Sequence, residues 1–158
     1  MIDEETYYVG ICPLCGMKKM RLVVERGRHR TYTNYVCTNC NCETHKQKVP
    51  LSSKFGTNNT VELSIRYLIH HWNSLEYYFL NRREYTNQKV LVHTKDAIEQ
   101  VYLKVCPICR SHDIIHVKDF EQEAECLYCK QCNFHSGYRP FIESPEEHSK
   151  LYTNWNNT

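Results

Sequence analysis

The sequence lacks a long apolar run, and no stretch approaches the roughly 18 apolar residues that a helix needs to span a bilayer. It also lacks the basic and then apolar opening of a secretion signal, because Asp3, Glu4 and Glu5 make the start of the chain acidic. These two absences predict a protein of the cytoplasm, with no membrane partner.

A strong charge of one sign is missing as well. The net charge is +2 and the sequence pI is about 8.0, which is too mild to indicate a nucleic-acid binder by itself. Residues 1–50 hold 8 basic and 5 acidic side chains, whereas residues 106–158 hold 5 basic and 8 acidic ones. The two ends of the chain therefore differ in the sign of their charge.

Signatures of catalysis are also absent. The 5 glycines form no glycine-rich phosphate loop, and no nucleophile–base pattern stands out. A Cys–His nucleophile built on Cys42 or Cys126 is the one enzymatic alternative. We therefore predict a protein that is not an enzyme.

Cysteine, in contrast, is abundant, with 10 residues in a chain of 158. A reducing cytoplasm keeps thiols reduced, so disulfides do not explain this number. Paired cysteines in that compartment usually bind metal or do redox chemistry. A structural metal would also compensate for the thin core of a small domain.

The chain contains an internal repeat, in which three landmarks recur in the same order. The landmarks are Cys-Pro-x-Cys at 12–15 and 106–109, Cys-x-x-Cys at 37–40 and 129–132, and Trp-Asn at 72–73 and 155–156. We therefore expect a first unit over residues 1–85, a connector over 86–99 and a second unit over 100–158. The connector pattern is ambiguous between strand and helix.

Each unit is predicted to form a small antiparallel sheet followed by a helix, which gives an α+β fold of two tandem zinc ribbons. Apolar and β-branched runs predict three strands in each unit. These runs are Tyr7–Ile11, Met20–Glu25 and Tyr32–Val36, then Val101–Val105, Asp113–Val117 and Gln122–Tyr128. The first helix can be capped by Asn59 or Thr60 and can extend to Leu80, and the second can begin at Ser144-Pro145 with Glu147 completing a capping box.

The spacing of the cysteine pairs predicts two structural zinc sites. Four thiolates in a tetrahedral array suit Zn²⁺, and two Cys-x-x-Cys turns brought together by a short sheet supply them. Such closed sites leave no open position for catalysis. The predicted ligands are Cys12, Cys15, Cys37 and Cys40 in the first site, and Cys106, Cys109, Cys129 and Cys132 in the second.

Several alternatives remain open at the metal sites. Iron is chemically possible with four thiolates. The cysteines could also be free surface thiols or redox pairs that bind no metal. Cys126 and Cys129 can replace Cys129 and Cys132 as the second pair. The repeat alignment otherwise leaves Cys42 and Cys126 outside the sites, as small buried side chains. Ligation by His45 or His135 is a weaker alternative.

The order of these landmarks resembles the restriction alleviation protein Lar family, which comprises small zinc-ribbon proteins of bacteriophages and prophages. The resemblance is carried by Cys-Pro-x-Cys-Gly, an aromatic-Val-Cys-x-x-Cys segment and a helix that ends in Trp-Asn. It implies that the eight cysteines named above bind metal. It also implies a phage origin, action in the host cytoplasm and interference with host defence.

The chain departs from the family pattern in three respects. Arg110 stands where a glycine often follows the first pair, and Asn41 and Asn133 stand where a glycine commonly follows the last cysteine. The unit is also present twice, which leaves the target open. The tryptophans are expected to pack over the ribbons, with base stacking or partner binding as the alternative.

The hairpin between the two cysteine pairs of the first unit is basic. Its cationic side chains are Lys18, Lys19, Arg21, Arg26, Arg28 and Arg30. Such a surface can contact phosphates without reading sequence, although an ordinary solvated hairpin explains it as well. The matching stretch of the second unit, residues 119–125, is acidic. Two equivalent DNA-binding ribbons are therefore not expected.

These observations predict a phage-type accessory zinc protein that binds and modulates a host defence or nucleic-acid-processing protein. The alternative is a regulator that binds nucleic acid directly through the basic hairpin. A purely structural module within a larger assembly is a third hypothesis.

Overall fold

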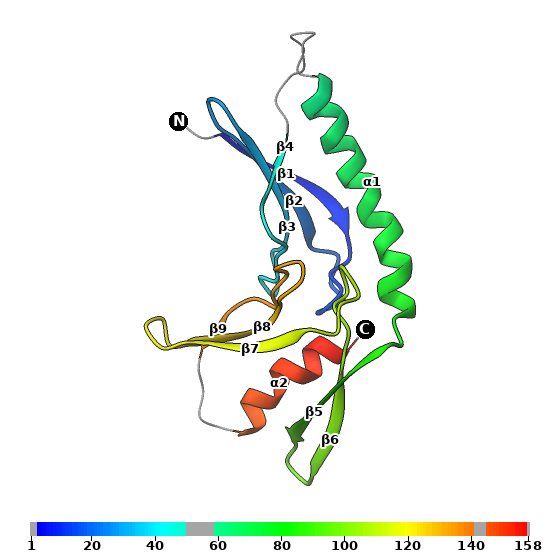
Figure 1. The fold of residues 1–158 in the computed structure, drawn as a ribbon, viewed down its shortest axis with the longest axis vertical. Coiled ribbons are helices and arrows are strands. Elements are labelled where there is room, and N and C mark those ends of the chain that lie inside the picture. Colours follow the sequence, from blue (N-terminus) through cyan, green and yellow to red (C-terminus); the bar gives the residue numbers. More distant parts are fainter. Residues whose placement is uncertain (1–2, 50–58, 141–144, 158) are drawn as a thin grey trace.

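The structure, a computed structural model, describes residues 3–49, 59–140 and 145–157. The predicted α+β class is confirmed, with antiparallel sheets and two helices (Figure 1). In chain order the elements are β1 (Asp3–Gly10), β2 (Met20–Arg26), β3 (Thr31–Cys37), β4 (Gln47–Val49), α1 (Asn59–Asn81), β5 (Tyr85–His93), β6 (Ile98–Lys104), β7 (Ile114–Asp119), β8 (Ala124–Cys129), β9 (Arg139–Pro140) and α2 (Pro145–Asn156).

The first four strands form one antiparallel sheet in the order of the sequence. In β2, Met20, Leu22 and Val24 are buried, whereas Arg21 and Val23 between them are partly exposed. Because side chains of a strand alternate between the two faces, one face of this sheet is apolar. That face forms the core of the first unit.

The long helix α1 covers the core of the first unit. Its buried residues Val61, Ile65, Trp72 and Phe79 recur at helical spacing. The Trp72 indole donates a hydrogen bond of 3.0 Å to the Ile11 carbonyl, next to the first cysteine pair. Neither helix of the described chain combines the length and the hydropathy that crossing a membrane requires.

Both helices start where the sequence pattern places them, at Asn59 and at Pro145. The proposed capping groups lie outside the described residues, since Ser144 and the side chains of Asn59, Thr60 and Glu147 are not described.

The second unit repeats this plan with one change of pairing. Strands β7, β8 and β9 form a three-stranded sheet, but β6 pairs with β5 and not with β7. In the first unit the corresponding strand, β1, pairs with β2. A short turn, in which Thr94 N–H donates to the Ala97 carbonyl, brings β5 and β6 together, and closing so short a loop costs little entropy. The segment 86–99, predicted as a connector, is thus mostly strand.

Helix α2 packs against β5, β6 and β8. The Trp155 indole donates to the Lys104 carbonyl at 2.8 Å, and Asn156 bonds both the Lys104 N–H and the Tyr102 carbonyl. Trp72 and Trp155 are both fully buried. The prediction that the tryptophans pack over the ribbons is therefore confirmed.

The two units join along a shared β edge. Glu43 and His135, which are matching positions three residues after the last cysteine of each unit, exchange backbone hydrogen bonds of 3.1 and 3.0 Å. The flanking positions Thr44 and Ser136 also match, and each hydroxyl accepts a backbone N–H at 2.9 Å within its own unit. The joint is thus approximately twofold symmetric.

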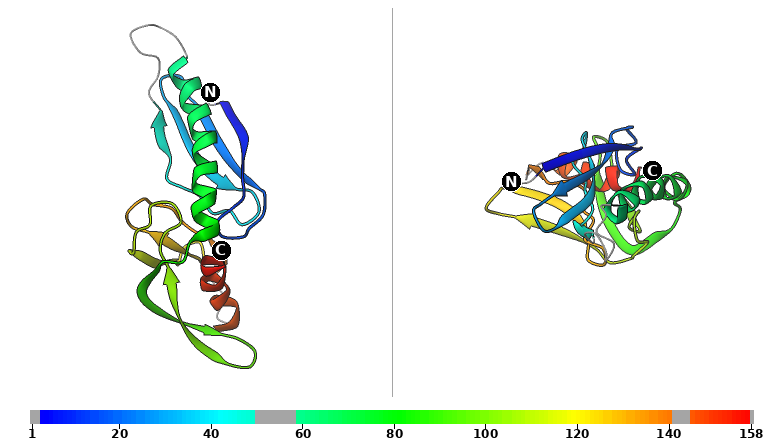
Figure 2. Two further views of the ribbon diagram at one scale, coloured as in Figure 1. Left: turned by 90° about the vertical axis from the view of Figure 1, so that its right-hand side faces the viewer. Right: turned by 90° about the horizontal axis from the view of Figure 1, so that it is seen from above.

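The end of α1 also reaches the second unit. Arg82 is buried and donates hydrogen bonds to the Val105 carbonyl at 3.1 Å and to the Trp155 carbonyl at 2.6 Å. One cluster of buried side chains runs through both units. Figure 2 shows α1 along the first sheet and α2 below its end, with the C-terminus beside that junction.

Candidate metal centres

Matching turns present the cysteines in the two units. Each Cys-Pro-x-Cys turn closes through a backbone hydrogen bond to the carbonyl of its first cysteine, from Gly16 at 3.1 Å and from Arg110 at 2.9 Å. Both donors have a left-handed backbone, with φ of 73° and 63°. Asn41 and Asn133 occupy the corresponding place after the second pairs, with φ of 63° and 64°. Asparagine tolerates this conformation better than most residues, but arginine does so at a cost.

Backbone N–H groups of these turns point at sulfur atoms. The N–H groups of Leu14 and Ile108 lie 3.4 Å from the sulfurs of Cys12 and Cys106. Hydrogen bonds to a thiolate favour its charged form, which is the form that binds metal. The N–H groups of Asn39 and Cys40 make such contacts with the Cys37 sulfur, at 3.4 and 3.5 Å, and favour its thiolate form.

The second centre contains four sulfur atoms that all lie within 4.8 Å of one another, from Cys106, Cys109, Cys129 and Cys132. The Sγ atoms of Cys106 and Cys132 are 3.6 Å apart, and those of Cys109 and Cys129 are 3.5 Å apart. A disulfide has sulfur atoms about 2.05 Å apart. Tetrahedral bonds of about 2.3 Å place sulfur atoms about 3.8 Å apart. The spacing thus fits four ligands around one ion.

The first centre holds five cysteines. The structure groups Cys12, Cys37, Cys40 and Cys42 within 4.8 Å of one another. Cys15 lies beside this group, with its sulfur 3.6 Å from that of Cys37. Three of the four predicted ligands, Cys12, Cys37 and Cys40, therefore share one group, and Cys15 adjoins it only through Cys37. Cys42, which the repeat alignment leaves outside, belongs to the group and lies 3.4 Å from Cys12. Each of the two centres can hold a metal ion.

Cysteine neighbours shift the thiol pKa values within each centre. Hydrogen bonding from the Cys12 thiol holds the pKa of Cys37 far below its usual range, and hydrogen bonding from Cys106 likewise lowers the pKa of Cys129. At least one thiolate per centre is therefore favoured before an ion enters. Metal binding needs such deprotonated ligands.

The alternative ligands lie elsewhere in the described part of the chain. Cys126 is buried outside both cysteine groups, and burial raises its pKa to about 11, which also makes it a poor nucleophile. Both ring nitrogens of His135 have other partners, the Glu43 carboxylate at 3.0 Å and the Gly137 N–H at 3.0 Å. His45 is exposed and joins neither group.

The predicted basic side chains do not form one patch. Arg26 is engaged by two carboxylates, Glu5 at 3.3 Å and Glu62 at 2.7 Å. Lys18 and Lys19 are exposed before the start of β2, and Arg21 on β2 is half-buried. Arg28 and Arg30 are exposed beyond the other end of this strand. Seven residues of strand separate the two ends by about 24 Å.

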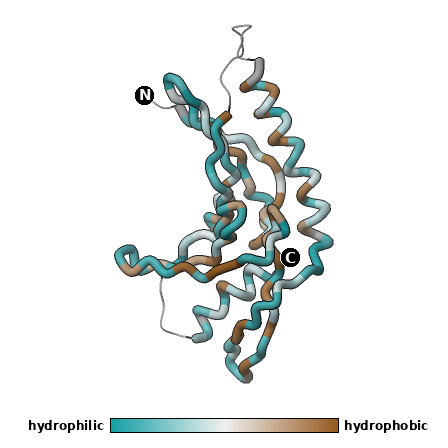
Figure 3. The backbone as a smooth tube through the Cα atoms, viewed as in Figure 1, coloured by the Kyte–Doolittle hydropathy of each residue, from teal (hydrophilic) through white to brown (hydrophobic). Residues whose placement is uncertain are grey.

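The tip of the acidic β7–β8 hairpin in the second unit carries an exposed aromatic side chain. Phe120 is 78% exposed there, between Asp119 and the exposed Glu121 and Glu123. The Asp119 carboxylate accepts the N–H groups of Glu121 and Gln122 at 3.1 Å, which holds the turn. Figure 3 shows that both hairpin ends are mainly hydrophilic.

Sequence reasoning missed one further group of ligand-type side chains. His116, Glu125 and His148 also place their ligand atoms within 4.8 Å of one another. Burial lowers the pKa of His116 below its usual value, although the Glu125 carboxylate opposes this shift. The three residues come from three elements, so no sequence spacing indicates the group.

Comparison of the chain with protein-family models, with curated proteins and with solved structures finds no match. The resemblance to the Lar family therefore stays a prediction, carried by the residues quoted for it.

Proposed function

We propose that this chain is a non-enzymatic zinc protein that binds another protein and modulates it. In line with the resemblance to the Lar family, the partner would be a host defence protein of the restriction type or a nucleic-acid-processing protein. The protein would be phage-encoded and would act in the cytoplasm of the host.

The proposal takes the two cysteine centres as structural zinc sites. Four thiolates are a preferred ligand set for Zn²⁺, and a site closed by four protein ligands leaves no position for water or substrate. In each centre, buried cysteines contribute to the core. The ions would then hold the strands in place and leave binding to the surface.

The observation that supports a protein partner most is the tip of the β7–β8 hairpin. An aromatic side chain as exposed as Phe120 is the kind of residue that anchors protein interfaces when it enters a pocket. Glu121 and Glu123 beside it would attract a basic rim around such a pocket and speed association. In Figure 1 this tip projects on the side opposite α1, clear of the rest of the molecule.

Direct nucleic-acid binding is supported less. Arg26 is already paired with carboxylates, and the lysines lie at the far end of β2 from Arg28 and Arg30. Only a few phosphates could be neutralised at one place, so the dependence of affinity on salt would be shallow.

The test compares capture of host proteins by the wild type, by Phe120→Ser and by the double variant Arg28→Glu/Arg30→Glu. We expect one partner, identified by mass spectrometry, to bind the wild type and the arginine variant but not Phe120→Ser. Phage plating on a restricting host that expresses each form should follow the same order.

Equal capture by Phe120→Ser would refute the role of this tip. Duplex binding that falls with salt and is lost in the arginine variant would favour the nucleic-acid alternative.

A further inference from the structure

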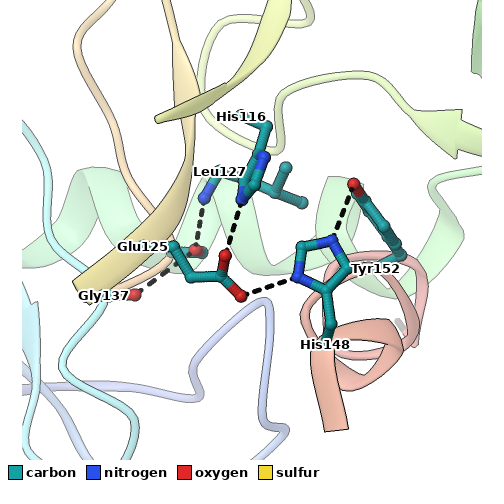
Figure 4. Close-up of polar contacts among 7 residues, drawn as sticks. His116, Glu125, Leu127, Gly137, His148 and Tyr152 are labelled. Atoms are coloured by element: carbon teal, nitrogen blue, oxygen red, sulfur yellow. Dashed lines mark hydrogen bonds and ion pairs between the residues drawn. The ribbon is translucent and has the colours of Figure 1, made fainter. Parts of the chain in front are cut away.

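Two histidines and one glutamate from three different elements meet beside α2 (Figure 4). His116 on β7 places Nε2 3.0 Å from one carboxylate oxygen of Glu125 on β8. His148 on α2 places Nδ1 2.7 Å from the other oxygen. We name these three residues the His–Glu–His cluster.

The carboxylate of this cluster is buried, whereas its imidazoles reach the surface. The Glu125 side chain is 4% exposed, and those of His116 and His148 are 23% and 28% exposed. A buried carboxylate is costly unless charged or polar partners compensate it. The partly exposed imidazoles leave an entry path for an ion.

The first unit shows that this fold does not need the cluster. Strand register matches His116 with Leu22 and Glu125 with Thr33. His148 lies seven residues before Trp155, as Ile65 lies seven before Trp72. Leu22, Thr33 and Ile65 are all buried. The same architecture is therefore stable with two aliphatic side chains and a hydroxyl at these places. Only the second unit has three potential metal ligands there, one of them a buried carboxylate.

We propose that the His–Glu–His cluster is a third metal site, which binds a divalent first-row transition ion through two imidazole nitrogens and one carboxylate oxygen. This set of ligands suits Zn²⁺ and Fe²⁺. The site goes beyond the proposed function, which concerns the two cysteine centres and the hairpin tip.

The geometry needs little change to admit an ion. Metal–ligand bonds of about 2.1 Å place neighbouring ligands of a tetrahedral ion about 3.4 Å apart. The two nitrogens contact different oxygens of Glu125, at 3.0 and 2.7 Å. One ligand atom from each residue nevertheless lies within 4.8 Å of the other two, so small side-chain rotations would bring all three to one ion. Three protein ligands leave a position for water, unlike the cysteine centres.

A second contact orients one of the imidazoles. The Tyr152 hydroxyl lies 3.4 Å from Nε2 of His148, the nitrogen that faces away from Glu125. Metal-binding histidines commonly have such a partner on the other ring nitrogen, which fixes the ring orientation. Without an ion, the same residues would form only a hydrogen-bonded network.

The test is metal analysis of the full chain, first loaded with Co²⁺ and then with Zn²⁺. We expect three ions per chain in the wild type and two in Glu125→Gln, with the thiolate-to-cobalt absorption of the cysteine centres unchanged. Titration should show that Glu125→Gln weakens binding of the third ion by at least about 100-fold. Loss of a residue that only supports a metal ligand already lowers metal affinity by up to about 100-fold, and Glu125 is a direct ligand in this proposal.

The first unit supplies a control that should fold. The triple variant His116→Leu/Glu125→Thr/His148→Ile copies its side chains and should retain both cysteine-bound ions while losing the third. Two ions per wild-type chain, both with thiolate absorption, would overturn the proposal. So would a third ion that persists in the triple variant.

Discussion

At the scale of the residue, the two metal centres differ in the number of thiols that surround them. The position that holds Cys42 in the first unit holds Phe134 in the second, and both side chains are fully buried. Phe134 packs against Trp155, with ring centroids 5.9 Å apart. The first centre has therefore exchanged a packing contact for a fifth sulfur atom.

This difference predicts unequal tolerance to the loss of one ligand. Because the Cys42 sulfur lies 3.4 Å from that of Cys12, it can replace a missing thiolate. We expect Cys15→Ser to keep its zinc, and the matched variant Cys109→Ser to lose the ion of the second centre. Zinc analysis after dialysis measures both.

The double variant Cys15→Ser/Cys42→Ser should lose the first ion. If Cys15→Ser alone loses it as fully as Cys109→Ser loses the second, Cys42 is not a reserve ligand.

At the scale of the element, a turn of one unit packs on a metal-binding turn of the other. Gly137 follows the shared β edge, and its backbone has φ of 84°. A β-carbon there would lie 2.4 Å from the Cys40 carbonyl oxygen and 2.8 Å from the Asn41 carbonyl carbon. The contact between the units is therefore backbone against backbone, with no room for a side chain.

Gly16 provides a matched comparison for this contact. Its φ of 73° is similar, but a β-carbon there would meet nothing within 4 Å. Gly16→Ala should therefore lower the free energy of unfolding only through backbone strain, by about 1–2 kcal/mol. Gly137→Ala should cost clearly more, since the two turns must separate.

Chemical denaturation of the zinc-loaded variants measures both changes. An equal loss of stability in the two variants would contradict the close packing at Gly137.

At the scale of the whole molecule, the buried Arg82 ties the end of α1 to the second unit. Burial lowers the pKa of this guanidinium to about 10, yet it stays charged at neutral pH. One acceptor, the Val105 carbonyl, directly precedes Cys106 of the second metal centre. The other, the Trp155 carbonyl, lies at the end of α2. The side chain thus links α1 to both.

Replacing Arg82 by methionine would leave these two carbonyls without their donor. Unsatisfied buried polar groups cost about 1–3 kcal/mol each, so we expect a loss of about 2–4 kcal/mol in the free energy of unfolding. The neighbouring Arg83 is exposed, and Arg83→Met should change stability by no more than about 0.5 kcal/mol. Thermal unfolding of the zinc-loaded variants compares the two losses of stability. Similar losses in Arg82→Met and Arg83→Met would refute the role of Arg82 in joining α1 to the second unit.

The sequence could predict what local patterns determine. Six strands, both helices and the meeting of the paired cysteines follow from alternation, helical spacing and the repeat. The pairing of β6 with β5, the Glu43–His135 edge and the His–Glu–His cluster could not be predicted in this way. The Glu43–His135 edge and the approach of His148 to Glu125 join residues that are distant in sequence, and no periodicity encodes them. The β5–β6 hairpin is local, but the pattern of residues 86–99 is ambiguous between strand and helix.

The reciprocal bonds between Glu43 and His135 have a consequence for how such a chain could arise. A lone ribbon with this edge exposed could pair with a second copy of itself, since an open strand edge recruits strands. Fusion of two copies turns that encounter into an intramolecular one, with an effective concentration on the order of millimolar. Once covalently paired, the halves no longer need to be identical. One could become basic, and the other could acquire its acidic tip and its histidines.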